Sequence, residues 1–107
     1  MEKLVEKNKW IELIRVRSSA GRVAEAIPEL KELIKDIEES EVQAETSLMQ
    51  HGLYEGDFAA VIVWGNGTPQ RTQSGLMLVE RMQELGSIEH AVWIPASKNG
   101  SYSLKKM

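Results

Sequence analysis

The stretch Asp57–Trp64 reads DFAAVIVW and is the most apolar segment of this 107-residue chain. After its first residue it is apolar at every position, which is typical of a strand buried on both faces. The turn Gly65–Gly67 ends it. We therefore expect a central strand in a sheet whose two faces are both covered.

The segments before this strand predict a strand, a helix and another strand. Trp10–Arg17 is rich in β-branched and bulky residues and predicts the first strand, after which Ser19 can cap a helix. Val42–His51 alternates weakly, and a loop at Gly52–Gly56 joins it to the central strand as a hairpin. The helix between them has apolar residues at the three- and four-residue spacing of one face: Val23, Ala26, Ile27, Leu30, Leu33, Ile34 and Ile37.

Helix-breaking residues set the expected bounds of two helices. A proline costs least in the first turn, so Pro28 predicts a start near residues 24–25, or a kink if the helix begins sooner. Thr68–Pro69 is a favourable cap and first position for a second helix that runs to about Leu85. We expect Gly86 to end that helix in a left-handed conformation.

A last strand over Ile88–Ile94 completes the order β-α-β-β-α-β. This order predicts the α+β class and a ferredoxin-like domain with an antiparallel four-stranded sheet. The expected domain covers residues 10–95, with an N-terminal lead-in at 1–9 and a C-terminal tail at 96–107. Two helices can cover only one face of the sheet, so we expect a second copy of the chain to cover the other in a homodimer.

Composition narrows the range of partners. The net charge of -3 and the lack of a clustered basic surface argue against nucleic acid. No window approaches the roughly 20 apolar residues that span a bilayer, and residues 1–10 contain no signal-peptide apolar stretch. The chain has no cysteine, hence no disulfide, thiol nucleophile or thiolate metal site. We expect a cytoplasmic protein with no membrane contact.

Two tryptophans are candidates for binding a small molecule. Trp64, at the end of the central strand, could stack on a flat aromatic substrate, or it could simply plug the end of the barrel. Trp93 offers the same two alternatives. Small residues could leave a cavity beside these rings: Ala59, Ala60, Gly75 and Ala91. If the pocket exists, we expect Trp64 and Trp93 to line it.

The polar group of such a pocket would be His90, Arg15 or Arg17. His90 alternates with apolar residues and faces a buried layer, where it could transfer protons or be satisfied by a carboxylate or carbonyl. Arg15 and Arg17 could bind a substrate carboxylate or phenolate, or form a solvated strand end or an intersubunit salt bridge. His51 borders the hairpin. The pattern shows no metal-ligand spacing and no convergent acid–base pair.

A small β-α-β-β-α-β chain with a tryptophan closing its third strand resembles the dimeric α+β barrel superfamily, in particular its antibiotic biosynthesis monooxygenase type. The resemblance covers residues 10–95. It implies two sheets packed into a barrel and a pocket in each subunit between sheet and helices. In the haem-degrading branch, the first strand has an Asn, the third strand ends in a Trp and the second helix has a His; Trp64 matches the Trp, but the Asn and the His are missing here. In the quinone-forming branch, a Trp matches Trp64.

The resemblance therefore implies a cofactor-independent monooxygenase-like enzyme that acts on an aromatic or polyketide-like small molecule, with no cofactor and no metal. A non-catalytic ligand-binding or structural homodimer is the alternative. An open pocket beside Trp64 and a titratable group would favour catalysis. A pocket filled by the protein's own side chains would favour the structural role.

Overall fold

A computed structural model describes residues 9–96 and confirms the expected order of elements. The expected lead-in and tail lie outside the described residues, apart from Lys9 and Ala96. The elements are β1 (Trp10–Arg17), α1 (Ala20–Ser40), β2 (Ala44–Gln50), β3 (Asp57–Trp64), α2 (Gln73–Met82) and β4 (Ser87–Trp93).

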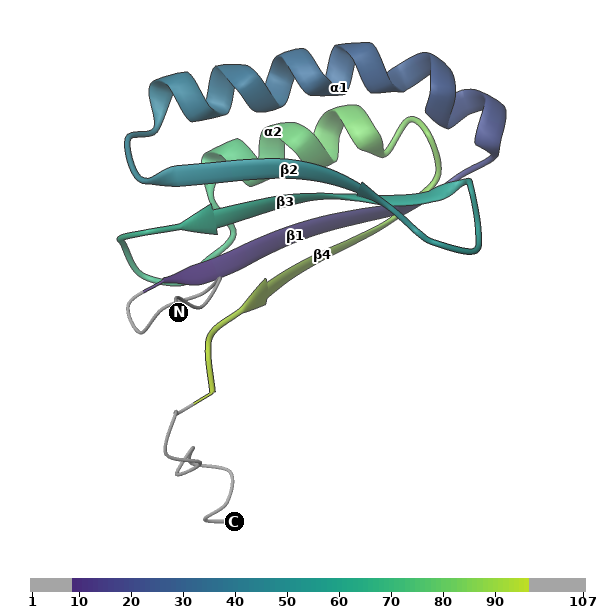
Figure 1. Cartoon of the computed structure of the whole chain (residues 1–107). Coiled ribbons are helices and arrows are strands. Elements are labelled where there is room, and N and C mark those ends of the chain that lie inside the picture. Colours follow the sequence, from purple (N-terminus) through teal and green to yellow (C-terminus); the bar gives the residue numbers. More distant parts are fainter. Residues whose placement is uncertain (1–8, 97–107) are drawn as a thin grey trace.

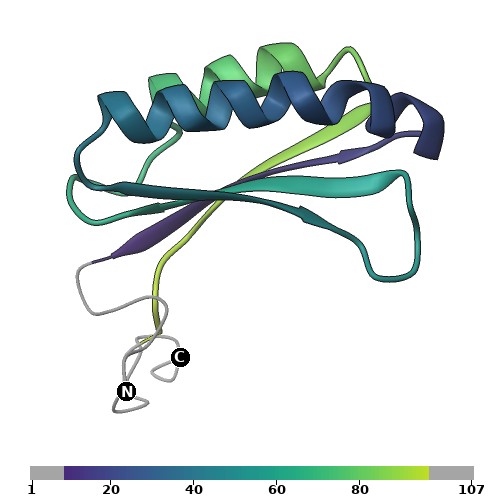
Figure 2. The same ribbon diagram turned by 45° about the horizontal axis from the view of Figure 1, so that its top comes forward.

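The four strands form one antiparallel sheet in the order β2-β3-β1-β4. Both helices pack against the same face of this sheet, and the other face has no helix over it (Figure 1, Figure 2). This is the ferredoxin-like arrangement predicted from the order of elements. Within residues 9–96, neither helix has the length and apolar character needed to cross a membrane.

The first helix begins earlier than Pro28 suggested. Ser19 is the N-cap, and its hydroxyl accepts a hydrogen bond from the Arg22 amide at 3.4 Å, so the helix starts at Ala20. Pro28 therefore lies inside the helix, where it removes one intrahelical hydrogen bond. The extra turn is retained because Val23 is buried in the core, and this packing outweighs the cost of the proline.

The second helix is shorter than expected at both ends. Thr72, not Thr68, is its N-cap, and the helix ends at Met82. Gly86 is not in the left-handed region, since the one glycine with a positive φ within residues 9–96 is Gly67. A side chain at Gly86 would instead overlap the backbone carbonyl of Arg17, so this glycine allows the turn before β4 to approach the end of β1.

The core lies between the sheet and the two helices. Alternate residues of each strand point inward, and the buried faces of both helices pack on them. The buried apolar residues of this cluster are Trp10, Ile14, Val16, Val23, Leu30, Ile34, Ile37, Phe58, Ala60, Ile62, Trp64, Leu78 and Met82.

The opposite face of the sheet, which we call the open face, is divided along the strands. At the end where β1 begins, the residues that β1, β3 and β4 place on this face are apolar, and β2 adds Glu45 and Ser47. The apolar residues are Ile11, Leu13, Val61, Val63, Ala91 and Trp93. At the end where β1 finishes, four charged residues lie on this face beside Met49, Ala59 and Ser87: Arg15, Arg17, Asp57 and Glu89. The strand registers place each group on neighbouring strands, so each forms a continuous patch.

Asp57 holds the charged patch together. Its carboxylate accepts two hydrogen bonds from Arg15, from Nε at 3.1 Å and from a terminal nitrogen at 3.0 Å. Arg17 Nε lies 3.6 Å from the same carboxylate, and Arg15 also faces Glu89 at 3.5 Å. The hydrogen bonds from Arg15 hold the pKa of Asp57 below its usual 3.8, against the opposing effect of burial.

This lowered pKa predicts an acid-dependent stability. A carboxylate with a lowered pKa in the folded state stabilises the protein above its unfolded pKa and loses that contribution as pH falls through the folded value. We expect Asp57→Asn to be less stable than the parent at pH 7, with the gap narrowing below about pH 4. Urea denaturation at several pH values measures this gap.

Glu89→Gln is the control, since Glu89 is exposed and faces Arg15 at the longer distance of 3.5 Å. The difference in unfolding free energy between Glu89→Gln and the parent should be small at every pH. A gap for Asp57→Asn that stays constant from neutral to acid pH would contradict the ion-pair explanation.

Candidate functional site

The centre of the candidate site is a buried carboxylate on β1. Glu12 alternates with Trp10 and Ile14 on the inward face and has no exposed surface. Oε1 accepts hydrogen bonds from Trp64 Nε1 at 3.0 Å and from the Thr72 hydroxyl at 2.7 Å. Oε2 accepts one from the Thr72 amide at 2.9 Å and lies 2.6 Å from Nε2 of His90. A carboxylate has about four acceptor positions, so the acceptor capacity of Glu12 is used by the protein itself.

Glu12 and His90 form an acid–base pair across neighbouring strands. Strands β1 and β4 are paired so that Glu12 lies opposite Val92 and Ile14 lies opposite His90, which puts both side chains on the inward face. The His90 side chain is 7% exposed. The three other contacts to Glu12 come from hydrogen-bond donors, which suit an ionised carboxylate, so Nε2 of His90 carries the proton that Glu12 accepts.

The expectation of no convergent acid–base pair was therefore wrong. The two residues are 78 positions apart in the chain, and only the pairing of the first strand with the last brings them together. The carboxylate does satisfy the histidine, one of the two alternatives left open for His90. The pair is also what proton transfer needs, because a histidine held by a carboxylate has its tautomer and orientation defined.

Thr72 connects this pair to the start of α2. Its hydroxyl donates to Glu12 and accepts a hydrogen bond from the Gly75 amide at 3.0 Å, which makes it the N-cap of the helix. The negative carboxylate thus lies at the helix N-terminus, where the helix dipole favours it. Gly75 lies directly over the carboxylate, and a side chain there would overlap Oε2 of Glu12.

Trp64 forms one wall of the cluster. Its ring stacks on Trp10 with centroids 5.8 Å apart and planes 25° apart. The two residues lie opposite each other in the β1–β3 register, and Trp10 Nε1 donates to the carbonyl of Asn66 at 3.0 Å. Both indole N–H groups therefore have partners, and the stacked pair closes this end of the core.

The candidate residues named from the sequence fall into two groups. Trp64 and His90 both contact Glu12 on the inward face. Arg15, Arg17 and Trp93 lie on the open face, and Trp93 is 60% exposed. The structure brings Trp64 and His90 together and places Trp64 and Trp93 on opposite faces of the sheet.

Glu12 and Thr72 were not among the residues expected at a site. A sequence signal for Glu12 existed, because it is an acid in the same alternating phase as Trp10 and Ile14. A charge at a buried strand position needs partners, and such a position indicates a polar cluster. Thr72 had no comparable signal, because its role depends on where α2 begins.

Two cavities lie elsewhere on the described part of the chain. One of about 420 Å³ is lined by Arg17, Ser18, Tyr54, Gly56 and Asp57. A smaller one of about 100 Å³ is lined by Lys9, Val42, Gln43, Ala44, Glu45, Val63 and Gly65. Neither is lined by Trp64 or His90, and Glu12 has no exposed surface. Among residues 9–96, no three His, Asp or Glu side chains are grouped as a metal site requires.

The contact between Gly75 and Glu12 predicts that a Gly→Ala substitution at Gly75 has the opposite effect on stability from the usual one in a helix. Replacing a helical glycine with alanine usually stabilises a protein by about 0.5–1 kcal/mol. We expect Gly75→Ala to destabilise it by about 1–3 kcal/mol, since the new methyl group has to displace a carboxylate held by four contacts. Thermal and urea denaturation measure the change.

Gly21→Ala is the matched control in the other helix. A side chain at Gly21 meets nothing within 4 Å, so this variant should be neutral or slightly more stable. Equal stabilisation of both variants would show that the Glu12 cluster does not constrain the approach of α2.

Comparison with known proteins identifies relatives in structure alone. No family model matches the chain, and no curated protein matches its sequence. A conserved Bacteroides thetaiotaomicron protein of unknown function, for which an oxidoreductase activity is suggested, has a similar solved structure. It shows a TM-score of 0.61 and 17% identity over 82% of this chain and 98% of its own.

Two further solved structures are similar. A Bacteroides thetaiotaomicron protein with a proposed role as an antibiotic biosynthesis monooxygenase has a TM-score of 0.57 and 12% identity, over 84% of this chain and 90% of its own. SnoaB, a cofactor-independent oxygenase from Streptomyces nogalater, has a TM-score of 0.55 and 9% identity, over 85% of this chain and 96% of its own. The expected ferredoxin-like α+β fold is thereby confirmed, and it is similar to the folds of these antibiotic biosynthesis monooxygenase-like proteins.

Proposed function

We propose that the protein is a cofactor-independent monooxygenase-like enzyme that acts on a flat aromatic or polyketide-like compound. The observation that supports this most directly is the Glu12–His90 pair, at 2.6 Å, beside the Trp64 indole. Two of the structurally similar proteins are described as oxygenases or monooxygenases, one of them as cofactor-independent. An enzyme without a cofactor needs a base to activate its substrate, and His90 is the best-placed base among the described residues.

In the proposed reaction an activated methylene group becomes a carbonyl group. Nδ1 of His90 takes a proton from the substrate, and Glu12 stabilises the resulting imidazolium through Nε2. The substrate carbanion gives one electron to O₂, and the two radicals combine into a peroxide on the same carbon. Loss of water from that peroxide leaves the ketone. The balance is R₂CH₂ + O₂ → R₂C=O + H₂O, with one oxygen atom in each product.

Substrate entry requires a movement near the start of α2. Trp64 and His90 both contact Glu12, and the segment 65–72 joins β3 to the helix beside them. The segment is tied to the cluster by the Thr72 contacts and by the hydrogen bond from Trp10 to Asn66. Opening this segment exposes the ring of His90 to a substrate while β1, β3 and β4 stay in place.

The decisive test is oxygen uptake with anthrone, a tricyclic ketone with an acidic methylene group. We expect the parent to consume O₂ and form anthraquinone without added metal or cofactor. His90→Gln should lower kcat at least about 100-fold, because it removes the base. Trp64→Phe should change KM more than kcat if the indole binds the substrate. Oxygen consumption and quinone absorbance measure both.

Arg22→Gln is the control, since Arg22 is exposed on α1 and bonds the carbonyl of Glu84 away from the cluster. It should leave turnover unchanged. Lack of O₂ uptake by the parent across a panel of acidic aromatic methylene compounds would contradict the proposal. Equal turnover by the parent and His90→Gln would also contradict it.

A non-catalytic dimer is the second candidate. The observation that favours it is the complete set of partners on Glu12. Under this alternative, Glu12→Gln and His90→Gln lower the melting temperature, and neither the parent nor any variant consumes O₂. Removing one partner of a buried hydrogen bond to a charged group costs about 1–3 kcal/mol or more, so stability falls in either case and only turnover discriminates.

Under either alternative we propose a cytoplasmic homodimer that pairs through the open face. The apolar patch of this face includes Leu13, Val61 and Trp93, and neither helix within residues 9–96 covers it (Figure 1). Burying apolar surface is worth about 25 cal/mol per Å², so a second copy gains most by covering this patch. The cytoplasm is the proposed location because a chain without cysteine needs no oxidising compartment.

Leu13→Glu tests this dimer. A charge in the middle of the apolar patch should convert the dimer to a 12.0 kDa monomer at micromolar concentration, as measured by light scattering. Val42→Glu is the control, since Val42 is 91% exposed and lies outside the sheet. A parent that is itself monomeric at that concentration would overturn the proposed assembly.

A further inference from the structure

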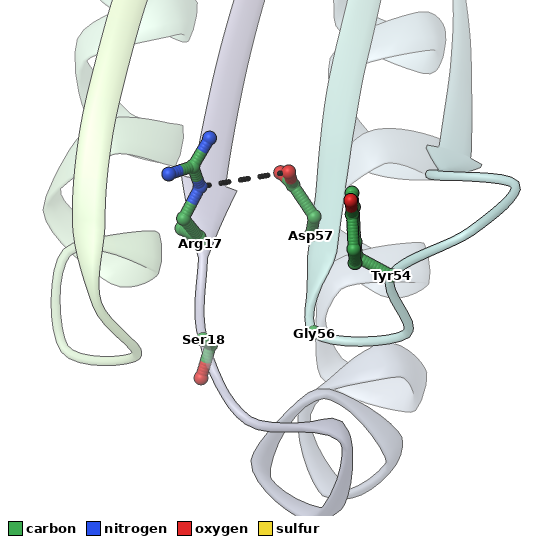
Figure 3. Close-up of a pocket in the computed structure, with 5 residues that line it drawn as sticks. All are labelled: Arg17, Ser18, Tyr54, Gly56 and Asp57. Atoms are coloured by element: carbon green, nitrogen blue, oxygen red, sulfur yellow. Dashed lines mark ion pairs between the residues drawn. The ribbon is translucent and has the colours of Figure 1, made fainter.

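The larger cavity lies on the charged patch, away from the Glu12 cluster. It has a volume of about 420 Å³ and is formed where β1 ends and β3 begins, beside the β2–β3 hairpin (Figure 3). Small-molecule sites usually occupy about 300–1,000 Å³. Asp57 and Arg17 lie on the open face, whereas Glu12 and His90 lie on the inward face. The two regions are therefore separate.

Arg17 gives this cavity a guanidinium group that pairs with Asp57 through Nε alone. Asp57 is bound by two hydrogen bonds to Arg15, at 3.1 and 3.0 Å, while Arg17 reaches it only through Nε at 3.6 Å. The Arg17 side chain is 71% exposed, and its terminal nitrogens point away from Asp57 in Figure 3. Arg15 makes the two hydrogen bonds to Asp57, so the terminal nitrogens of the Arg17 guanidinium remain available to bind an anion.

The ring of Tyr54 supplies a flat surface, and hydrogen bonds hold both the amide and the carbonyl of this residue. The His51 ring accepts hydrogen bonds at Nδ1 from the amides of Leu53, at 2.9 Å, and Tyr54, at 3.3 Å. The Tyr54 carbonyl accepts one from the Asp57 amide at 3.1 Å. The rings of His51 and Tyr54 lie 4.8 Å apart, and Tyr54 remains 64% exposed beside the cavity. A ring held in this way loses little freedom when a second flat group stacks on it.

We propose that this cavity binds an aromatic carboxylate. The carboxylate pairs with the Arg17 guanidinium, and the aromatic ring lies against Tyr54. The proposal is independent of the oxygenase chemistry, because none of the residues it uses contacts Glu12 or His90. It also lies at the far end of β1 from the apolar patch assigned to the second copy of the chain.

Binding of 2-naphthoate, measured by its fluorescence anisotropy with the full chain, tests the site. We expect saturable binding to the parent and at least about tenfold weaker binding of neutral 2-naphthamide, which has the same ring system but no charge. Arg17→Gln should weaken 2-naphthoate by about tenfold and leave 2-naphthamide unchanged. Tyr54→Leu should weaken both ligands, because it removes the stacking surface.

Lys35→Gln is the charge-matched control, since it removes one exposed cation from α1. It should bind 2-naphthoate as the parent does. Equal weakening by Lys35→Gln and Arg17→Gln would show general charge attraction and overturn the site. So would equal affinity of Arg17→Gln and the parent. The aromatic class of ligand would be overturned if micromolar inorganic phosphate displaced 2-naphthoate completely and Tyr54→Leu bound 2-naphthoate as tightly as the parent.

Light scattering of each variant shows whether a change in binding arises from a change in oligomeric state. Arg17→Gln and Tyr54→Leu should have the parent's mass, because both residues lie outside the apolar patch. Weakened binding at unchanged mass supports the proposal. Weakened binding that appears only when the mass changes would overturn it, since the effect would then arise from the dimer.

Discussion

The structure depends on one buried charge, the carboxylate of Glu12. It joins β1 to β3 through Trp64, to β4 through His90 and to the start of α2 through Thr72. Taking a carboxylate out of water is costly unless every acceptor position finds a donor, and here each one does. The position of α2, the need for glycine at Gly75 and the closure of the core by Trp64 all follow from this requirement.

The order of elements and the bounds of β1 and β3 could be predicted because they depend on local patterns. Trp10–Arg17 is rich in bulky and β-branched residues, Asp57–Trp64 is an apolar run, and both match the observed strands. The bounds of the helices could not be read in the same way. Pro28 is tolerated because Val23 packs in the core, and α2 starts at Gln73 because Thr72 is tied to Glu12. Both effects are tertiary, and local propensity does not contain them.

The candidate site was half predictable for the same reason. Trp64 and His90 could be named from their positions on apolar strands, and the phase of Glu12 marks it as a buried acid, but its contacts with them could not be recognised without strand pairing. The register of β1 against β4 decides that His90 meets Glu12, while Arg15 and Trp93 fall on the other face. A shift of one residue would exchange the two faces, so this information lies in the pairing of distant segments.

The same cluster can serve stability and catalysis, and the two roles make opposite demands on it. A carboxylate with every acceptor position filled is rigid, and rigidity is what defines the tautomer of His90 as a base. A substrate, however, must reach the other nitrogen of that ring, and the segment 65–72 lies in its way. Both demands act on Thr72, because its hydroxyl bonds Glu12 and also caps the first turn of α2. An enzyme built on this cluster therefore has to open at α2 and keep the Glu12–His90 contact within the sheet.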